Sequence, residues 1–553
     1  MLQEQAAGAR GSQLKQLDDS YDAVVIGAGI GGLVSAALLA KAGQSVCVFD
    51  MGSRPGGYLM GFERKGFVFD TSTHWLNECK PGGSVRNAFD MIAPGAPEMP
   101  ALRRIRRYKG PRFDYTLTNA PDELRDELIR DFPDDERGLH EFFAEARRLG
   151  DIWKMLARRQ RTHLTMGPLE KAAFGLKSIR GLAFARYAGM DMATALARFF
   201  STDGPGQIYA AEQNILSALM PIGWAYDGDY QRPPNGGAKK IPQWLSSVLR
   251  QWGAPVHLNC QVEKIHVERG RAVGVTVARL RNRKKHDVKC KYVVAACDLA
   301  SLYETALPPG SIDPGWKKRL DDSDLYASTF AISIGLDVPA EELGLGEEVV
   351  YVTADGIERE EHNHTDPHKA GISVVAGSAR DASLAPEGKG TLSLQVMADM
   401  SWGDYWKTGP GYERGSAYEE FKKQYADVLM DRIEAVLVPE LREHIEFLDI
   451  ATPITHWRYT NNYQGSIMGA RATAKNFKNG VAGYYTPIEN LLVGGQWAEN
   501  GGGVPVAVRA GINSALLILR REKPAAFRMF SRVVDGELAP SECVGEELRS
   551  IAS

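Results

Sequence analysis

Glycines at a fixed spacing near the start of the chain indicate a site for a phosphate-bearing ligand. Gly27, Gly29 and Gly32 form a Gly-x-Gly-x-x-Gly motif between an apolar run, residues 22–27, and a stretch of helical character, residues 33–42. In such a turn the first glycine permits the bend, the second lets the backbone approach a pyrophosphate, and the third lets helix pack on strand. The free N–H groups and the dipole at the start of the helix then bind the anion.

An acidic residue at the matching distance completes the pattern. Asp50 ends a second apolar run, SVCVFD, and is placed to accept hydrogen bonds from ribose hydroxyls. The uncharged stretch from Ala23 to Ala40 could mimic a membrane span, but strand, turn and helix account for its four glycines better than one continuous helix does. We therefore predict a dinucleotide site; the alternative is a degenerate fold without a ligand.

Several blocks of the sequence carry a family resemblance. The run VVIGAGIGGLVSAALLAKAGQSVCVFDMGSRPGGY, followed by GFVFDTSTHWL, resembles the amino terminus of FAD-dependent oxidoreductases of the phytoene desaturase, carotenoid isomerase and retinol saturase group. The segments PPNGGAKKIPQWL, YVVAACD and NLLVGGQWAENGGGVPVAVRAGINSA resemble later blocks of the same group, in the same order. The chain departs from the group's pattern at Asn500, where proline is common, and at Tyr58, where arginine is usual.

The resemblance implies FAD as the cofactor and names the residues that would hold it. They are Gly27, Gly29, Gly32, Asp50, Arg54, Gly56, Gly57, Tyr58, Val262, Gly495, Gln496, Gly502, Gly503 and Val504. Independently of the family, residues 501–503 can form a loop that lies flat against a planar ring, and Pro505 suits the first turn of a helix aimed at the ligand. The alternative is a glycine-rich connector that binds nothing.

No Ser-His-Asp or Cys-His set is evident, and the expected chemistry explains why. A flavin can take a hydride from an allylic carbon of a polyene, and weak bases suffice to remove a proton from the resulting cation, so the protein chiefly positions the chain and excludes water. Glu499, Arg471 and Asp227 are the polar residues to test first as catalytic groups. His74 is a further candidate, although a lone histidine there is more often a packing or hydrogen-bonding residue.

Composition limits the classes of protein to which the chain can belong. Its 553 residues are 44% apolar and 24% charged, which excludes a disordered tail, a collagen and a disulfide-stapled miniprotein. The formal net charge of -3 gives no basic field for nucleic acid. The six cysteines contain no C-x-x-C pair, and the first twenty residues lack the apolar core of an export signal, so a cytoplasmic location is expected.

The blocks together predict an α/β fold: a Rossmann-type FAD-binding domain with an inserted α+β substrate domain. The expected boundaries are an extension over 1–21, the FAD-binding domain over 22–80, 241–300 and 486–525, the substrate domain over 81–240 and 301–485, and a tail over 526–553. Because only one Gly-x-Gly-x-x-Gly motif is found, a second domain dedicated to a nicotinamide is not expected.

Two further segments have compositions that suggest binding. Residues 151–200 carry nine Lys or Arg against three Asp or Glu, interleaved with apolar side chains, which is typical of a surface for an anionic membrane. A helical lid with a solvated basic face explains the same pattern. Residues 358–368 are rich in His, Asp and Glu but lack helical ligand spacing, so a solvated loop is the better interpretation, and no metal is expected.

These features lead to one hypothesis and two rivals. The hypothesis is a peripherally membrane-associated FAD enzyme that acts on carbon–carbon double bonds of a lipophilic isoprenoid by desaturation, saturation or cis/trans isomerisation. One rival is a flavin amine oxidase. The other is a non-catalytic prenyl-lipid escort protein, which the intact glycine turn and the GGGVP loop disfavour. The sequence leaves the reaction direction and the oligomeric state open.

Overall fold

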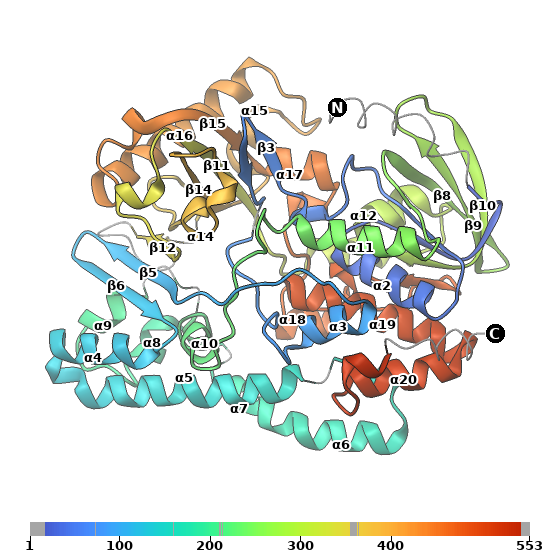
Figure 1. Cartoon of the computed structure of the whole chain (residues 1–553), viewed down its shortest axis with the longest axis horizontal. Coiled ribbons are helices and arrows are strands. Elements are labelled where there is room, and N and C mark those ends of the chain that lie inside the picture. The colour runs from blue at the N-terminus through green and yellow to red at the C-terminus, as the bar shows by residue number, and fades with distance from the viewer. Residues whose placement is uncertain are drawn as a thin grey trace.

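The computed structural model describes residues 17–543, except 72, 159, 188, 210, 211, 213, 354–361 and 363. Two seven-stranded sheets form the framework, with helices packed around each of them. Figure 1 shows the sheets on opposite sides of the molecule, with a layer of helices along its lower edge. Within the described ranges, no helix is long and apolar enough to cross a membrane.

The first sheet is built around parallel strands that carry the dinucleotide motif. Its order is β7-β2-β1-β10-β9-β8, with β16 also paired to β10. The parallel strands are β1 (Ser20–Ile26), β2 (Val46–Phe49), β7 (Val256–His257), β10 (Lys285–Ala295) and β16 (Leu491–Val493). Strands β8 (Cys260–Glu268) and β9 (Arg271–Arg279) extend the sheet in antiparallel fashion from the first half of β10. The parts of these strands at residues 23–26, 46–49, 292–295 and 491–493 are apolar and buried, as expected for a parallel sheet covered by helices.

Two helices that begin at the carboxyl ends of these strands cross closely. They are α2 (Ile30–Lys41) and α19 (Val504–Glu522). A Cβ at Gly511 would lie 2.3 Å from the carbonyl oxygen of Gly31, and the hydroxyls of Ser35 and Ser514 are 3.1 Å apart. The small residues therefore let the first turns of α2 pack closely on the middle of α19. Three further helices complete this core: α3 (Ser84–Ile92), α11 (Lys240–Gln251) and α20 (Pro524–Val534).

The second sheet is antiparallel apart from one pair. Its order is β15-β11-β14-β13-β12-β5-β6, and only β12 and β5 run parallel. The strands are β5 (Arg104–Gly110), β6 (Phe113–Thr118), β11 (Ser328–Leu336), β12 (Val349–Val352), β13 (Ile372–Ala376), β14 (Gly390–Ala398) and β15 (Ile445–Ala451). Helix α16 (Ser416–Val436) buries Tyr418, Tyr425 and Leu429 in the core of this sheet.

A third core joins one end of the second sheet to a layer of helices. Helices α4 (Pro121–Asp131), α5 (Glu136–Ala157) and α10 (Ile215–Tyr226) pack against β5 and β6. After α5 the chain forms α6 (Pro168–Ser178), a short 3-10 turn over residues 179–181 and α7 (Leu182–Ala185). Helix α6 lies at the lower edge of the molecule in Figure 1.

The α/β class with a Rossmann-type domain is confirmed, and three local expectations need correction. Helix α2 begins at Ile30 rather than Leu33, because Gly31 and Gly32 already form its first turn. Residues 524–534, which overlap the expected tail, form α20 and bury Phe530. Helix α3, expected in the substrate domain, packs in the core of the first sheet. The remaining domain boundaries stay a prediction.

Candidate functional site

One cavity of about 1040 Å³ runs from the glycine turn of the first sheet to the inner face of the second. Its wall includes the ends of β1 and β2, the first turns of α2 and α19, and residues of β12, β13 and β14. A cavity at the carboxyl ends of parallel strands is the usual place for a ligand in this kind of fold. Its volume is at the upper end of the range for small-molecule sites and can hold an extended ligand.

The glycine turn has the shape that a pyrophosphate needs. Gly27 adopts φ +104°, a conformation that glycine takes without strain, and its N–H donates to Phe49 O at 2.8 Å. A Cβ built on Gly29 meets nothing within 4 Å, so the backbone faces open cavity at this residue. The first N–H groups of α2 have no helical partners and lie at the same end of the cavity. The turn therefore fits the diphosphate of a dinucleotide.

Asp50 has a second role that the spacing of the motif did not suggest. Its carboxylate accepts hydrogen bonds from the backbone N–H of Ala28 and of Gly52, both at 2.6 Å. Burial raises the pKa of Asp50, while these two N–H donors favour its charged form. The carboxylate thus holds the glycine turn in place, and its remaining lone pairs are left for a ribose hydroxyl.

All but one of the sequence-predicted cofactor residues line this cavity. Those in the wall are Gly27, Gly29, Asp50, Arg54, Gly56, Gly57, Tyr58, Val262, Gly495, Gln496, Gly502, Gly503 and Val504. Gly32 is the exception, because a Cβ there would lie 2.1 Å from Gly27 O. Gly32 serves the contact between helix and strand, which is the role its place in the motif predicts.

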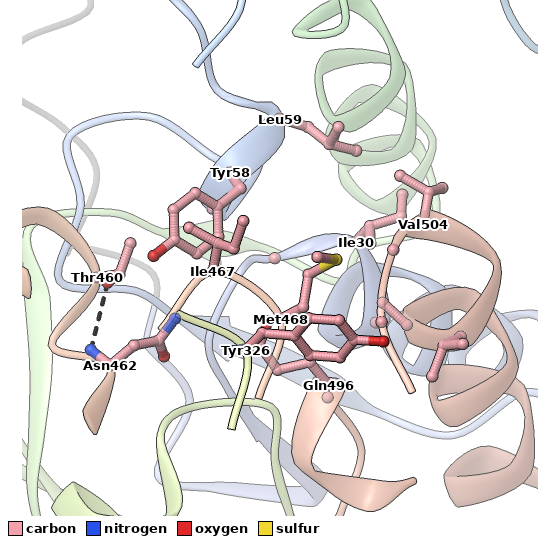
Figure 2. A pocket seen from close by; sticks show the side chains of 18 of the residues that line it. Ile30, Tyr58, Leu59, Tyr326, Thr460, Asn462, Ile467, Met468, Gln496 and Val504 are labelled. Carbon is pink, nitrogen blue, oxygen red and sulfur yellow. Dashed lines mark hydrogen bonds between the residues drawn. The ribbon is translucent and has the colours of Figure 1, made fainter. Parts of the chain in front are cut away.

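At the other end of the predicted cofactor site, side chains from five separate segments converge. Figure 2 shows them around one space: Ile30, Tyr58 with Leu59, Tyr326, the segment of Thr460, Asn462, Ile467 and Met468, and Gln496 with Val504. Met468 packs directly on the glycine loop, since a Cβ on Gly502 would lie 2.6 Å from Met468 Cβ. Apolar side chains on both sides of the space suit a planar ring system.

Tyr58 stands where arginine is usual in the resembling group, and its hydroxyl hydrogen-bonds to the protein backbone. Its hydroxyl donates to the carbonyl oxygen of Ser466 at 3.2 Å, and burial raises the pKa of Tyr58 to about 12. The contact ties the turn after Gly57 to the loop that carries Met468. Arg54 is exposed and lies in the wall, so it supplies a cation at the end where phosphates would bind.

Of the four catalytic candidates, only His74 lines the cavity. Its Nε2 lies 2.7 Å from Gln395 Oε1, and Gln395 donates its amide to Thr71 O at 3.1 Å. This arrangement makes Nε2 the protonated nitrogen of a neutral ring. Burial lowers the pKa of His74 to about 4, and the nearby cations Arg380 and Arg106 act in the same direction. His74 therefore acts as a hydrogen-bonding residue of the wall.

Glu499 lies behind the wall and positions a residue that is part of it. Its carboxylate accepts a hydrogen bond from Tyr484 and pairs with Arg509 Nε at 2.5 Å. Arg509 reaches the cavity from the second turn of α19. Glu499 is thus placed to position Arg509, and a catalytic role for it stays a prediction.

Asp227 and Arg471 also lie outside the described wall. Asp227 pairs with Lys80 and Lys154, and although burial opposes charge, these two ion pairs hold its pKa below the usual range. The Arg471 guanidinium lies over the Tyr326 ring at 5.6 Å, and Tyr326 itself lines the cavity. Both residues therefore lie in the surroundings of the cavity and not in its described wall.

The half of the cavity beyond His74 has an aromatic wall that the sequence did not reveal. The residues that line it are Trp153 of α5, Trp224 of α10, Tyr351 of β12 and Trp75 of a loop, and they are spread over almost three hundred residues. Trp153 packs on Trp224 with ring centroids 6.2 Å apart. No local motif marks these residues, since only the tertiary fold brings them together. In the described part of the chain no group of three or more metal-ligating side chains is found, and residues 358–361 and 363 of the histidine-rich segment lie outside the described residues.

Comparison with known proteins places this geometry in a family. The family model described as flavin containing amine oxidoreductase matches residues 30–519. An all-trans-retinol 13,14-reductase of Danio rerio is 26% identical, covering 95% of this chain and 91% of the relative. A chloroplastic prolycopene isomerase of Daucus carota is 25% identical over 90% of this chain and 79% of its own length.

The solved structures support the fold. A crystal structure of an oxidoreductase from Methanosarcina mazei has a TM-score of 0.56 and 18% identity, covering 90% of this chain and all of that chain. The resemblance seen in the sequence is confirmed by the curated relatives, and FAD is confirmed as the cofactor by the family. The glycine turn, the cavity and the family match across most of the chain agree. The chain belongs to the flavin containing amine oxidoreductases.

Proposed function

We propose that the protein is an FAD-dependent oxidoreductase that acts on carbon–carbon double bonds of a lipophilic polyene. The observation that carries the proposal is the continuity of the cavity, whose dinucleotide half opens directly into a long half walled by Trp153, Leu156, Trp224, Val396 and Met397. An apolar chain entering this half would reach the ring-binding end beside Met468. The names of the curated relatives, a retinol reductase and a prolycopene isomerase, support a substrate of this class.

The residues that would hold the cofactor divide by the part of FAD they suit. Gly29 and the start of α2 suit the diphosphate, Asp50 and Val262 the adenosine end, and Gly502 with the start of α19 the ring. When bound, the flavin supplies hydride chemistry, which no side chain can provide. The chain itself binds and orients the two ligands and keeps water from the reacting carbons.

The charges in the wall disfavour an amine as the substrate. The described wall contains four carboxylates: Asp50, Glu78, Glu212 and Asp298. Asp50 accepts hydrogen bonds from the backbone N–H groups of Ala28 and Gly52, and Glu78 from that of Ser84. Asp298 accepts from those of Ser301 and Tyr463. Glu212 pairs with Arg106. Three of these carboxylates thus hold backbone segments in place and an arginine neutralises the fourth, so none of them is set aside as the counterion of a substrate ammonium. An uncharged substrate needs none.

Within residues 151–200, only a shorter segment exposes several apolar side chains side by side, as a membrane-binding surface would. Trp153, which is 40% exposed, and Leu156 line the cavity, and Tyr187 is buried. In contrast, Leu169, Leu176, Ile179 and Leu182 are 87%, 72%, 56% and 65% exposed and do not line the cavity. These four apolar side chains recur at helical spacing along α6, the 3-10 turn and α7, and Lys171, Lys177 and Arg180 lie among them, also exposed. We define Leu169 to Leu182 as the apolar surface and propose that it docks on an anionic bilayer.

The proposed surface is connected to the cavity through α5. A Cβ at Gly181 would lie 3.4 Å from Leu156, and Leu156 lines the cavity with Trp153 and Ala157. A lipid dissolved in the bilayer could therefore enter along α5 without crossing water. The cytoplasmic location stays a prediction.

Anaerobic flavin reduction and product analysis test the proposed function. Purified protein loaded with FAD is mixed with all-trans polyenes and, separately, with putrescine and benzylamine. We expect the polyenes to be converted to desaturated, saturated or isomerised products, with the flavin spectrum identifying net oxidation or reduction. Conversion of the amines with no change in any polyene would overturn the proposal, and a colourless protein that cannot be reconstituted with FAD would favour the escort protein.

A further inference from the structure

A short backbone ladder stands beside the ring-binding end of the cavity. Segments 324–326 and 469–471 are joined by an antiparallel bridge and by two backbone hydrogen bonds, each 2.9 Å long. The N–H of Gly501 donates to Ala470 O at 2.8 Å, so the glycine loop that begins there is tied to the same ladder. Side chains on the ladder are therefore held at a fixed place relative to the glycine loop.

Tyr326, at the end of the first of these segments, presents its hydroxyl to the cavity. The residue lines the cavity, and its hydroxyl is not buried and forms no hydrogen bond with a described residue. Figure 2 shows the hydroxyl directed into the space that Ile30, Met468 and Val504 surround. The hydroxyl can therefore reach a ligand that fills this space.

The other hydroxyl groups labelled at this end already have partners in the protein. Tyr58 donates to Ser466 O at 3.2 Å, and Thr460 Oγ1 donates to His456 O at 2.8 Å. A flavin ring carries two carbonyl oxygens on one edge, and a carbonyl that leaves water needs a new donor. The hydroxyl of Tyr326 is available for this purpose, and those of Tyr58 and Thr460 are not.

Arg471, on the second segment, places a positive charge over one face of the Tyr326 ring. Its guanidinium carbon lies 5.6 Å from the ring centroid and outside the cavity wall. Burial raises the pKa of Tyr326, and Arg471 acts in the opposite direction. The hydroxyl is thus protonated at neutral pH, and the cation beside the ring makes it a stronger donor.

We propose that Tyr326 donates a hydrogen bond to a carbonyl oxygen of the bound flavin ring and raises its reduction potential, with Arg471 as the positioning residue behind it. The inference rests on the binding of FAD and on no particular substrate. Reduction by a hydride adds two electrons and one proton to the ring, and the additional negative charge is shared with the carbonyl oxygens. A donor binds a charged acceptor more strongly than a neutral one, so this hydroxyl favours the reduced ring.

The reduction potential of the FAD-loaded protein tests the assignment. It is measured without oxygen against a reference dye, while xanthine and xanthine oxidase reduce both slowly. Tyr326→Phe keeps the ring beside Arg471 and removes only the hydroxyl. We expect this variant to lower the equilibrium constant for reduction about tenfold, which is about 30 mV for a two-electron couple.

Two further measurements separate the hydrogen bond from a change in structure. Resonance Raman spectra of the oxidised protein should show a carbonyl band of the ring at higher frequency in Tyr326→Phe, because a hydrogen bond weakens the C=O bond. Arg471→Gln should lower the potential of the wild type and change that of Tyr326→Phe much less, since residues that act together are not additive. Tyr412→Phe, in a residue that packs on Trp457 outside the cavity wall, is the matched control and should leave potential and spectrum unchanged.

The possible results decide the two roles separately. A wild-type potential and a wild-type carbonyl band in Tyr326→Phe would overturn the assignment, and slower turnover of a polyene in that variant would then place the hydroxyl against the substrate. Equal losses from Arg471→Gln with and without the Tyr326 hydroxyl would overturn the role of Arg471. None of these results bears on the proposed function, which the conversion of polyenes or amines decides. If Arg471→Gln does not hold FAD, the potential and the spectrum of Tyr326→Phe still test the hydrogen bond.

Discussion

Gly29 and Gly32 stand three residues apart in one motif, yet a side chain would meet opposite surroundings at the two positions. A Cβ at Gly29 enters open cavity, whereas one at Gly32 lies 2.1 Å from Gly27 O. Gly29→Val should therefore fold and lose FAD, because its side chain occupies the space for the diphosphate. Gly32→Ala should lower the free energy of unfolding by about 1–3 kcal/mol, because helix and strand must move apart.

Visible absorbance and thermal unfolding of the FAD-free forms measure the two effects separately. FAD is removed first, since a bound ligand would itself stabilise the wild type. Gly29→Val should be colourless with an unfolding temperature close to that of the wild-type apoprotein, and Gly32→Ala should unfold at lower temperature. A yellow Gly29→Val protein with wild-type affinity for FAD would show that the diphosphate does not bind at this turn.

The residues that sequence analysis identified share one property: their role follows from near neighbours in the chain. Gly27 and Gly29 could be recognised because turn, helix and Asp50 follow within a short stretch. Arg106 and Glu212 could not, because the partners of this ion pair are more than one hundred residues apart. The contact of Glu499 with Arg509 could not be recognised for the same reason, since it depends on how α19 packs.

At the scale of elements, α6 is the one helix of more than ten residues, in the part of the chain that the structure describes, that buries none of its side chains. Its eleven residues include none that is buried, although Leu169 and Leu176 lie on it. The sequence predicted an amphipathic basic segment, and only the fold shows which part of it lacks a protein partner. An apolar helix face left in water is unfavourable, so its exposure indicates a binding surface.

Leu169→Glu combined with Leu176→Glu should release the protein from anionic membranes. The change removes two apolar contacts and adds two negative charges, and each buried leucine contributes about 1.5–3 kcal/mol. Co-sedimentation with vesicles of phosphatidylcholine and phosphatidylserine measures the binding, and far-UV circular dichroism checks the fold. Wild-type binding should also weaken when phosphatidylserine is left out, because Lys171, Lys177 and Arg180 then lose their attraction to the surface.

Phe477→Glu supplies the matched control for this surface. Phe477 is 67% exposed on α18 (Ala474–Asn479), a helix remote in sequence from α6, and its replacement adds one negative charge against the two of the leucine variant. The control should sediment like the wild type. Equal loss of binding in the control, or full binding by the double leucine variant, would place the membrane contact elsewhere on the molecule.

At the scale of the whole molecule, buried titratable groups set how stability depends on pH. Burial lowers the pKa of His74, His257 and His456 to about 4 each. Burial raises the pKa of Asp70 to about 6 and that of Asp229 to about 7. Between pH 7 and 5 the unfolded chain protonates the histidines and the folded chain protonates the aspartates, so the two sets act in opposite directions.

Removing two of the histidines should reverse the pH dependence of stability over this range. Each histidine destabilises the fold by roughly 2 kcal/mol on acidification from pH 7 to 5, whereas the two aspartates stabilise it. The wild type should therefore lose a little stability, and the variant with His257→Gln and His456→Gln should gain some. Urea unfolding at pH 7 and pH 5 measures the free energy of unfolding. The same change in this free energy between the two pH values for wild type and variant would show that the two histidines are not held neutral in the fold.

The two sheets also bear on how the flavin exchanges electrons. The first sheet carries one glycine turn at the start of α2, and the second is antiparallel except between β5 and β12. A nicotinamide dinucleotide normally binds at the carboxyl ends of parallel strands joined through helices. In the described part of the chain, no second unit of this kind stands beside the cavity. We therefore expect a quinone, oxygen or a redox-neutral cycle to serve the flavin.

Anaerobic mixing of the FAD-loaded protein with excess NADPH tests this expectation directly. Flavin absorbance should persist over the time in which the same preparation turns over a polyene, because no tight NADPH site is available. A dithionite-reduced sample provides the control for complete bleaching, and a short-chain quinone added to it should restore the colour. Bleaching by NADPH on the timescale of turnover would contradict the prediction, and it would mean that the nicotinamide docks in the aromatic half of the cavity, where the polyene would then have to compete with it.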